Sequence, residues 1–66
     1  MKIKLLIEEL QKQGWVLDRI RGSHHVFVHF DAVRPVVVPV HNKEIPDFYA
    51  KGILRQAKGS LSKGAR

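Results

Sequence analysis

The chain has 66 residues, a formal net charge of +6 and no cysteine. Without cysteine it can form neither a disulfide framework nor a thiolate zinc site, so side-chain packing alone must stabilise the fold. The basic excess indicates a polyanionic partner, although solubility, an acidic protein partner or an anionic membrane surface would also account for it. No apolar run is long enough for a signal peptide or a membrane span, and we expect an intracellular, cytoplasmic protein.

The first predicted element is an amphipathic helix over residues 2–13. Its apolar positions recur at the spacing of one helical face: Ile3, Leu6, Ile7 and Leu10. Gly14 stands where a C-terminal cap belongs. Residues 15–21 are rich in β-formers and are followed by Gly22 and Ser23, which predicts a first strand.

Two further apolar runs predict a second and a third strand. Residues 24–30 and 35–40 are separated by the sequence Asp-Ala-Val-Arg, which has the length and polarity of a hairpin connection. Because Pro35 and Pro39 cannot donate to a sheet ladder, we expect the third strand at the edge of the sheet. The three strands should therefore form a meander.

Residues 42–61 carry apolar side chains at helical intervals and predict a second helix. This helix begins near Pro46 or, because glycine weakens a helix interior, only at Gly52. Residues 62–66 lack an apolar anchor and are expected to be disordered. The order of elements predicts a single α+β domain over residues 1–66, with a three-stranded antiparallel sheet and two helices on one face.

The four histidines are the candidates for chemistry. We expect no metal site, because His25 and His29 share a strand face but stand about 13 Å apart. If the hairpin turns symmetrically within its connecting loop, His24 lies beside His41. Two such imidazoles titrate near neutrality and can act as general base or acid on a phosphodiester, although ordinary solvated histidines are the alternative. His29 is interpreted as an ordinary residue of the strand face.

Basic and aromatic residues are the candidates for contacts with a nucleic acid. The basic candidates for phosphate contacts are Arg19, Arg21, Lys43, Lys51, Arg55 and Lys58. The aromatic residues are expected to lie mainly in the core: Trp15, Phe27, Phe30, Phe48 and Tyr49. If Tyr49 or Trp15 is exposed instead, it can stack on a base.

Four stretches follow one another along nearly the whole chain: LQKQGW, RGSHHVF, VVVPVHNKEI and KGILRQA. Together they resemble the HicA toxins, the mRNA interferases of bacterial and archaeal toxin–antitoxin pairs. The resemblance implies a fold similar to the double-stranded RNA-binding domain. It also implies an endoribonuclease that cleaves mRNA without a metal or another cofactor and so inhibits translation.

The resemblance assigns the catalytic role to His24, the histidine of the Gly-Ser-His motif. His41 matches the family's Pro-x-His position, for which no role is implied. The residues expected to contact substrate are Gly22, Ser23, Arg21, His41, Lys43, Lys51 and Arg55. In the expected mechanism neutral His24 takes the proton of a 2′-hydroxyl, which yields a 2′,3′-cyclic phosphate and a 5′-hydroxyl. Cleavage should therefore fall as His24 becomes protonated below neutrality.

The resemblance also implies a protein partner, an antitoxin of the HicB type that binds the toxin and blocks its site. Two alternatives remain for the function. The chain can be a non-catalytic RNA-binding module that reads RNA by shape, with binding that survives the loss of His24 and weakens with salt. It can also act only through a protein partner, with negligible affinity for RNA at physiological salt.

Overall fold

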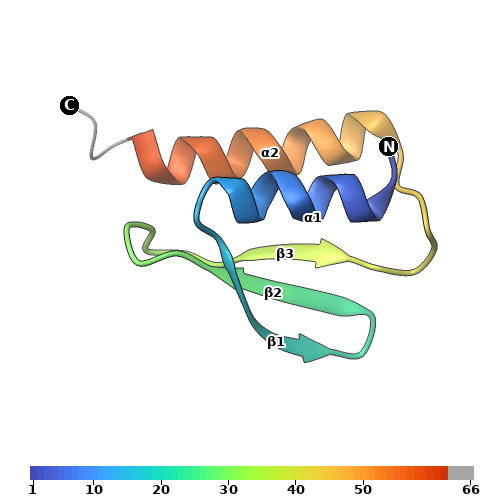
Figure 1. Cartoon of the computed structure of the whole chain (residues 1–66), viewed down its shortest axis with the longest axis horizontal. Helices are drawn as coiled ribbons and strands as arrows, with labels where there is room; N and C mark the ends of the chain where they lie inside the picture. Colours follow the sequence, from blue (N-terminus) through green and yellow to red (C-terminus); the bar gives the residue numbers. More distant parts are fainter. Residues whose placement is uncertain (63–66) are drawn as a thin grey trace.

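The computed structural model describes residues 1–62 and contains two helices and three strands (Figure 1). In chain order the elements are α1 (Ile3–Lys12), β1 (Val16–Arg21), β2 (His24–Val28), β3 (Val36–Pro39) and α2 (Asp47–Ser62). This order confirms the predicted helix, strand, strand, strand, helix arrangement. The expectation of disorder over residues 62–66 lies outside the described residues, except that residue 62 is the last residue of α2.

The three strands form one antiparallel sheet in the order β1-β2-β3, which confirms the meander with β3 at an edge. Between β2 and β3, His24 pairs with Pro39 and Phe27 pairs with Val36. The predicted register, which paired His24 with His41, is wrong by two residues. The chain turns earlier than predicted because β2 ends at Val28, where His29 leaves the ladder and accepts a hydrogen bond from the Ala32 N–H through its carbonyl oxygen.

Helix α1 ends in a Schellman motif, which uses Gly14 as predicted. Gly14 has a φ of +96°, its N–H donates to the carbonyl oxygen of Gln11, and the Trp15 N–H donates to that of Leu10. Leu10 and Trp15 are both buried, so the motif also carries the apolar contact that usually accompanies it. This cap directs the chain from α1 into β1.

Helix α2 begins at Asp47, directly after Pro46, and continues through Gly52. The alternative start at Gly52 is therefore wrong. Pro46 suits the first turn because its carbonyl oxygen accepts the N–H groups of Tyr49 and Ala50, while a proline there gives up no hydrogen bond of its own. Burial of one helical face outweighs the cost of a glycine at an exposed position.

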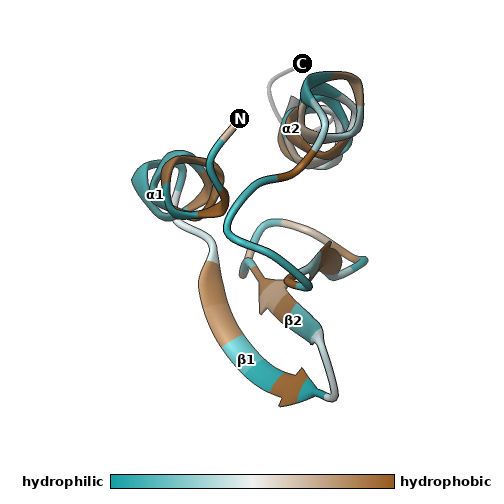
Figure 2. Cartoon of the chain, turned by 90° about the vertical axis from the view of Figure 1, so that its right-hand side faces the viewer, coloured by the Kyte–Doolittle hydropathy of each residue, from teal (hydrophilic) through white to brown (hydrophobic). Residues whose placement is uncertain are grey.

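The core lies between the two helices and one face of the sheet, and the hydrophobic sides of the helices face each other (Figure 2). Its buried side chains are Ile3, Leu6, Leu10, Trp15, Phe27, Val36, Val38, Ile45, Ala50, Ile53 and Ala57. Both helices lie on one side of the sheet, as predicted. The core includes side chains of β2 and β3, whereas all six residues of β1 are exposed.

Only two of the five aromatic residues are in the core, which corrects the prediction. Trp15 and Phe27 are buried, whereas Phe30 and Phe48 are 92% and 79% exposed and Tyr49 is about half exposed. Phe30 lies in the loop after β2, beyond the cover of the helices. Phe48 and Tyr49 lie in the first turn of α2, where they stack on each other with 6.4 Å between ring centroids. The buried face of α2 begins one residue later, at Ala50.

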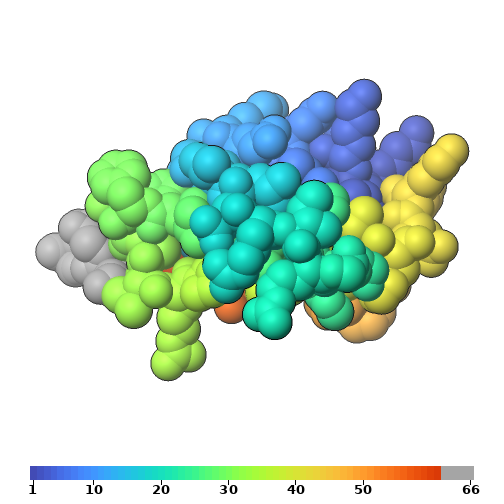
Figure 3. Space-filling view, turned by 90° about the horizontal axis from the view of Figure 1, so that it is seen from below, coloured from blue at the N-terminus to red at the C-terminus, as the bar shows by residue number. Residues whose placement is uncertain are grey.

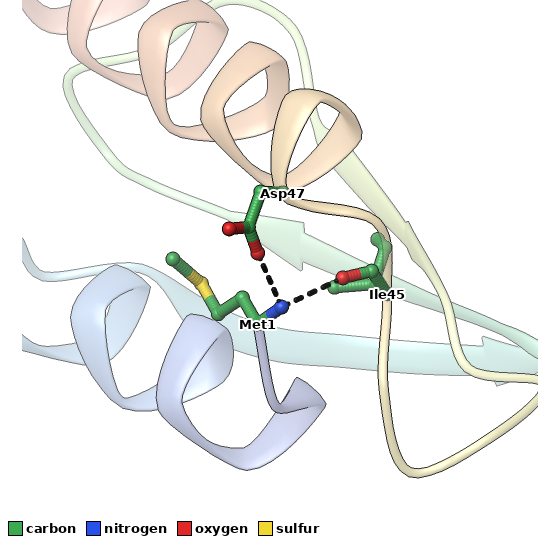
Figure 4. A network of polar contacts seen from close by, with 3 residues as sticks. All are labelled: Met1, Ile45 and Asp47. Carbon is green, nitrogen blue, oxygen red and sulfur yellow. Dashed lines mark hydrogen bonds and ion pairs between the residues drawn. The ribbon is translucent and has the colours of Figure 1, made fainter.

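The amino terminus is tied to the start of α2 (Figure 4). The ammonium group of Met1 donates to the carbonyl oxygen of Ile45 and forms an ion pair with the Asp47 carboxylate. The hydrogen bond from this ammonium group, then its charge, lower the pKa of the Asp47 carboxyl, and the charge of Lys51 adds to the effect. Backbone hydrogen bonds between residues 1–3 and 43–45 reinforce the contact.

Candidate active site

His24 lies on the face of the sheet that the helices leave open. Alternate residues of a strand point to opposite faces, and Phe27 of β2 is part of the core under the helices. His24 and Val26 therefore point to the other face, and Val26 is indeed outside the core cluster. Figure 3 shows this face from below, with the β1–β2 hairpin in teal across its middle and most of α2 hidden behind it.

A tight turn places His24 at the first position of β2. Arg21 and His24 are paired residues, so Gly22 and Ser23 form a two-residue hairpin loop. Gly22 has a φ of +60° and no residue other than glycine has a positive φ within residues 1–62, which defines a type II′ turn. The Ser23 carbonyl oxygen accepts the Val40 N–H at 2.7 Å, which fastens the turn to the end of β3.

His24 and His41 meet at this end of the sheet, as predicted. Their ring centroids are 6.0 Å apart and the rings stand at 81° to each other. The contact survives the error in register because a shift of two residues leaves a side chain on the same face. His41 then lies diagonally from His24, two residues beyond its partner Pro39, and within reach of its ring.

Both imidazoles are accessible. His24 and His41 are exposed, and their ring nitrogens form no hydrogen bond with any of residues 1–62. An exposed imidazole with free nitrogens can give or take a proton without breaking a contact of the fold. The pair therefore has the equipment for acid–base chemistry on a molecule bound at this end of the sheet.

A shallow hollow next to the pair joins basic and apolar side chains. It is lined by Arg19, Arg21, His24, Val26, Pro35 and Val37. Arg21 is the cross-strand neighbour of His24, as its position in the sequence suggested. Arg19 was one of several candidates for phosphate contacts in the sequence, and the structure places it in the lining of the hollow. Its guanidinium group also forms an ion pair with the Asp18 carboxylate. The sequence signal for Arg19 is its spacing of two residues from Arg21 within one strand.

The other two histidines belong to the fold. His25 is half-buried and points to the helix side of the sheet, opposite to His24. His29 lies just after β2 rather than in it, which corrects its placement on the strand face. Its Nδ1 accepts the Asp31 N–H, so the neutral ring carries its proton on Nε2, which donates to the Gln13 carbonyl oxygen at 2.9 Å.

The remaining residues predicted to contact substrate are not brought to the hollow. Lys51 and Arg55 are exposed on α2, on the helix side of the sheet. Lys43 lies in the loop between β3 and α2, where its carbonyl oxygen accepts the Ile3 N–H and its side chain lines a groove beside α1. The structure thus groups Arg21, Gly22, Ser23, His24 and His41 and separates these three lysine and arginine residues from them.

No three potential metal-ligating side chains of residues 1–62 come together. Within the same residues no helix is both long and apolar enough to cross a membrane.

The fold and the site together define a small basic α+β protein with a pair of exposed histidines at one end of an open sheet face. A family model described as the HicA toxin of bacterial toxin–antitoxin systems matches residues 3–58. This match covers most of the chain and includes both histidines, so the chain belongs to the HicA toxin family. It is therefore a toxin of a toxin–antitoxin system. A comparison with curated protein sequences finds no significant match.

Proposed function

We propose that this protein is a cytoplasmic endoribonuclease that cleaves mRNA, inhibits translation and needs no metal or other cofactor. The observation that carries the proposal is the exposed His24–His41 pair beside Arg21, in a chain of the HicA toxin family. When the 2′-hydroxyl of the RNA is the nucleophile, histidine can serve as general base or acid and arginine can stabilise the charge on the phosphate.

His24 acts as the general base in the first step. Its neutral imidazole takes the proton of a 2′-hydroxyl while that oxygen forms a bond to the adjacent phosphorus. The bond between phosphorus and the 5′-oxygen of the next nucleotide breaks, which leaves a 2′,3′-cyclic phosphate. Positioned proton transfer of this kind contributes about 10²–10⁴ in rate.

His41 acts as the general acid for the leaving group. As imidazolium it gives a proton to the departing 5′-oxygen, so the second product carries a 5′-hydroxyl. The two ring centroids are 6.0 Å apart, so both imidazoles lie within reach of the same phosphodiester. A base and an acid of the same residue type give a bell-shaped dependence of the rate on pH.

Arg21 stabilises the charge that develops on the phosphate. Its position opposite His24 in the β1–β2 ladder brings a permanently charged guanidinium next to the base. A hydrogen-bond donor directed at charge that develops in the transition state raises the rate of the chemical step, whereas a contact of equal strength in the ground state does not. Gly22 and Ser23 serve this arrangement through the type II′ turn that holds the two residues opposite each other.

An antitoxin of the HicB type is the proposed regulator. Family membership supports a cognate antitoxin in general. Since His24 and His41 are exposed, a protein that covers this end of the sheet would exclude RNA from both at once. Neutralisation would then require no change in the fold of the toxin.

The experiment is cleavage of a mixed-sequence RNA in the presence of EDTA by the wild type, His24→Ala and the matched control His25→Ala. The two histidines are neighbours on opposite sheet faces, so the control shows whether cleavage depends on the imidazole of His24 or on any histidine at this end of β2. We expect cutting by the wild type and by His25→Ala, and none by His24→Ala. If no variant cuts but all bind the RNA equally, the protein is a binding module and the proposal is wrong.

A further inference from the structure

We infer that the open sheet face binds the RNA as a single strand, with Arg19 and Arg21 on its phosphates and the apolar residues of the hollow under its sugars and bases. This inference rests on the proposed function and adds to it the form of the substrate and the surface that holds it. It also selects this face over the exposed sides of the helices.

Positive charge on β1 is aligned with the candidate base His24. Arg19 and Arg21 point to the same face of β1 and are about 6.6 Å apart along the strand. Arg21 stands opposite His24, and Arg19 stands opposite Val26. The two guanidinium groups therefore form a row that leads along the sheet to His24. Among the residues that line the hollow none is acidic, and the nearby Asp18 is paired with Arg19.

Apolar side chains form the floor of the hollow between the two arginines and β3. Val26 is 5% exposed although no helix covers it, because its cross-strand neighbours Arg19 and Val37 flank it. Val37 itself is 43% exposed, and Pro35 continues the apolar surface toward the loop. An apolar strip beside a row of cations matches one strand of RNA, which offers phosphates on one side and unpaired bases on the other.

The chemistry of cleavage excludes a regular duplex as the substrate. The attacking 2′-oxygen must approach phosphorus from the side opposite the leaving 5′-oxygen. A nucleotide held in a regular double helix cannot reach this alignment, whereas a single strand can rotate into it. A duplex also turns its bases inward and would leave the apolar floor without a partner. A single strand therefore fits both the hollow and the reaction.

The helices offer a less uniform surface. The groove beside α1 places Glu8 and Glu44 among its lysines, so a phosphate chain would meet carboxylates there. On α2, Lys51 and Arg55 lie on the helix side of the sheet, away from the face that carries His24. RNA bound to either helix would not deliver a phosphate to the histidine pair without bending around the molecule.

The experiment measures binding of a fluorescent RNA in the His24→Ala background, which removes cleavage. Three double variants each remove two positive charges: Arg19→Ala with Arg21→Ala on the sheet, Lys51→Ala with Arg55→Ala on α2, and Lys4→Ala with Lys12→Ala on α1. Each is measured against single-stranded RNA and against a duplex of the same sequence over a range of salt, after its thermal unfolding has been checked. A fourth comparison sets Val37→Glu in the hollow against Val33→Glu, an exposed valine of the loop.

We expect the sheet pair to weaken single-strand binding by about tenfold or more and to reduce the salt slope by about 1.4, the value for two lost phosphate contacts. The two helix pairs should change the affinity by less than about twofold, because they remove only distant charge. Val37→Glu should weaken binding and Val33→Glu should not. Equal losses in all three pairs, a larger loss in the α2 pair, or tighter binding of the duplex would overturn the inference.

Failure of the inference is distinguishable from failure of the proposed function. The same three double variants are placed in the wild-type background, where cleavage in EDTA is measured. If the wild type cuts RNA and Arg19→Ala with Arg21→Ala cuts with unchanged kcat/KM, cleavage by the histidine pair still holds, whereas the sheet surface and the role of Arg21 are excluded. If the wild type does not cut, the proposed function fails whatever the binding data show.

Discussion

His24 is the first residue of β2 and His29 follows its last residue, and the two histidines occupy opposite kinds of environment. Both nitrogens of the His29 ring are bound, to the Gln13 carbonyl oxygen and to the Asp31 N–H. The ring also packs against Trp15 and Phe30, with centroids 5.3 and 5.1 Å away. His24 is exposed, and its only ring contact among residues 1–62 is with His41.

This difference separates a structural histidine from one that is free for chemistry. Protonation of the His29 ring at Nδ1 would break the hydrogen bond from the Asp31 N–H, and Nε2 is already bound to the Gln13 carbonyl oxygen. His24 can exchange a proton at no cost to the fold. The residue type is the same, so the neighbours decide the role.

The largest expected effect is on cleavage, and it appears when His24→Ala is compared with His29→Ala. His24→Ala should lower the cleavage rate by about 10²–10⁴. Because the side chain is exposed, the free energy of unfolding should change by no more than about 0.5 kcal/mol. His29→Ala should do the reverse, with lower stability and an unchanged rate per folded molecule. Single-turnover cleavage and denaturant unfolding of both variants test this prediction. If both variants lost cleavage and stability to a similar extent, the two histidines would not differ in role.

The next effect concerns the partner of His24. His41→Ala should reduce cleavage by about 10², the lower end of the range for general acid catalysis, because water can also protonate the leaving oxygen. The change on the alkaline side of the profile should disappear: the rate of the variant should no longer fall at high pH but should still fall at low pH. A pH–rate profile of the variant tests this. An unaltered bell shape would assign His41 to packing alone.

Gly14→Ala sharpens the comparison from the structural side. A Cβ at residue 14 would lie 2.7 Å from Nε2 of His29, and the backbone there has a φ of +96°. The strained backbone and the lost hydrogen bond to Gln13 should together cost about 2–3 kcal/mol of unfolding free energy. Urea unfolding measures the loss.

Gly52→Ala is the matched control for that change. A Cβ at residue 52 meets nothing within 4 Å, and the residue lies inside α2. This variant should gain about 0.5–1 kcal/mol, because alanine is the better helix former. Equal destabilisation by both substitutions would show that the contact with His29 is not the cause.

The smallest effect is electrostatic and concerns the start of α2. The folded state lowers the pKa of Asp47, so its ion pair with the Met1 ammonium group stabilises the fold above the ordinary carboxyl range and is lost as the pH falls through the lowered pKa. Asp47→Asn should therefore be less stable than the wild type near neutrality, and the difference should close in acid. Thermal unfolding as a function of pH measures it. As a control, Glu9→Gln alters an exposed carboxyl that forms no ion pair with residues 1–62.

Local patterns were sufficient to predict much of this fold. The apolar spacing of α1, the glycine that ends it and the prolines that confine β3 to an edge act within a few residues. The meeting of His24 and His41 was also predicted, although from a register that is wrong by two residues. The prediction still held because a shift in register by an even number of residues keeps each side chain on the same face of the sheet.

The remaining features depend on contacts that are distant in sequence. The ring of His29 fixes the turn by bonding to Gln13, 16 residues away, and no local pattern encodes that contact. The exposure of β1 depends on which strands the helices cover, and so does the hollow that contains Arg19. The exposure of Phe48 follows from the start of α2 at Asp47, which periodicity alone left open.

The measurement that tests the central claim most directly is cleavage at one mapped bond when the nucleotide on its 5′ side lacks the 2′-hydroxyl. If neutral His24 acts on that hydroxyl, the deoxy substitution should abolish cutting at that bond while the protein still binds the RNA and cuts elsewhere. The wild-type products at the unmodified bond should be a 2′,3′-cyclic phosphate and a 5′-hydroxyl. Continued cutting at the deoxy position would mean that water is the nucleophile and would contradict the role given to His24.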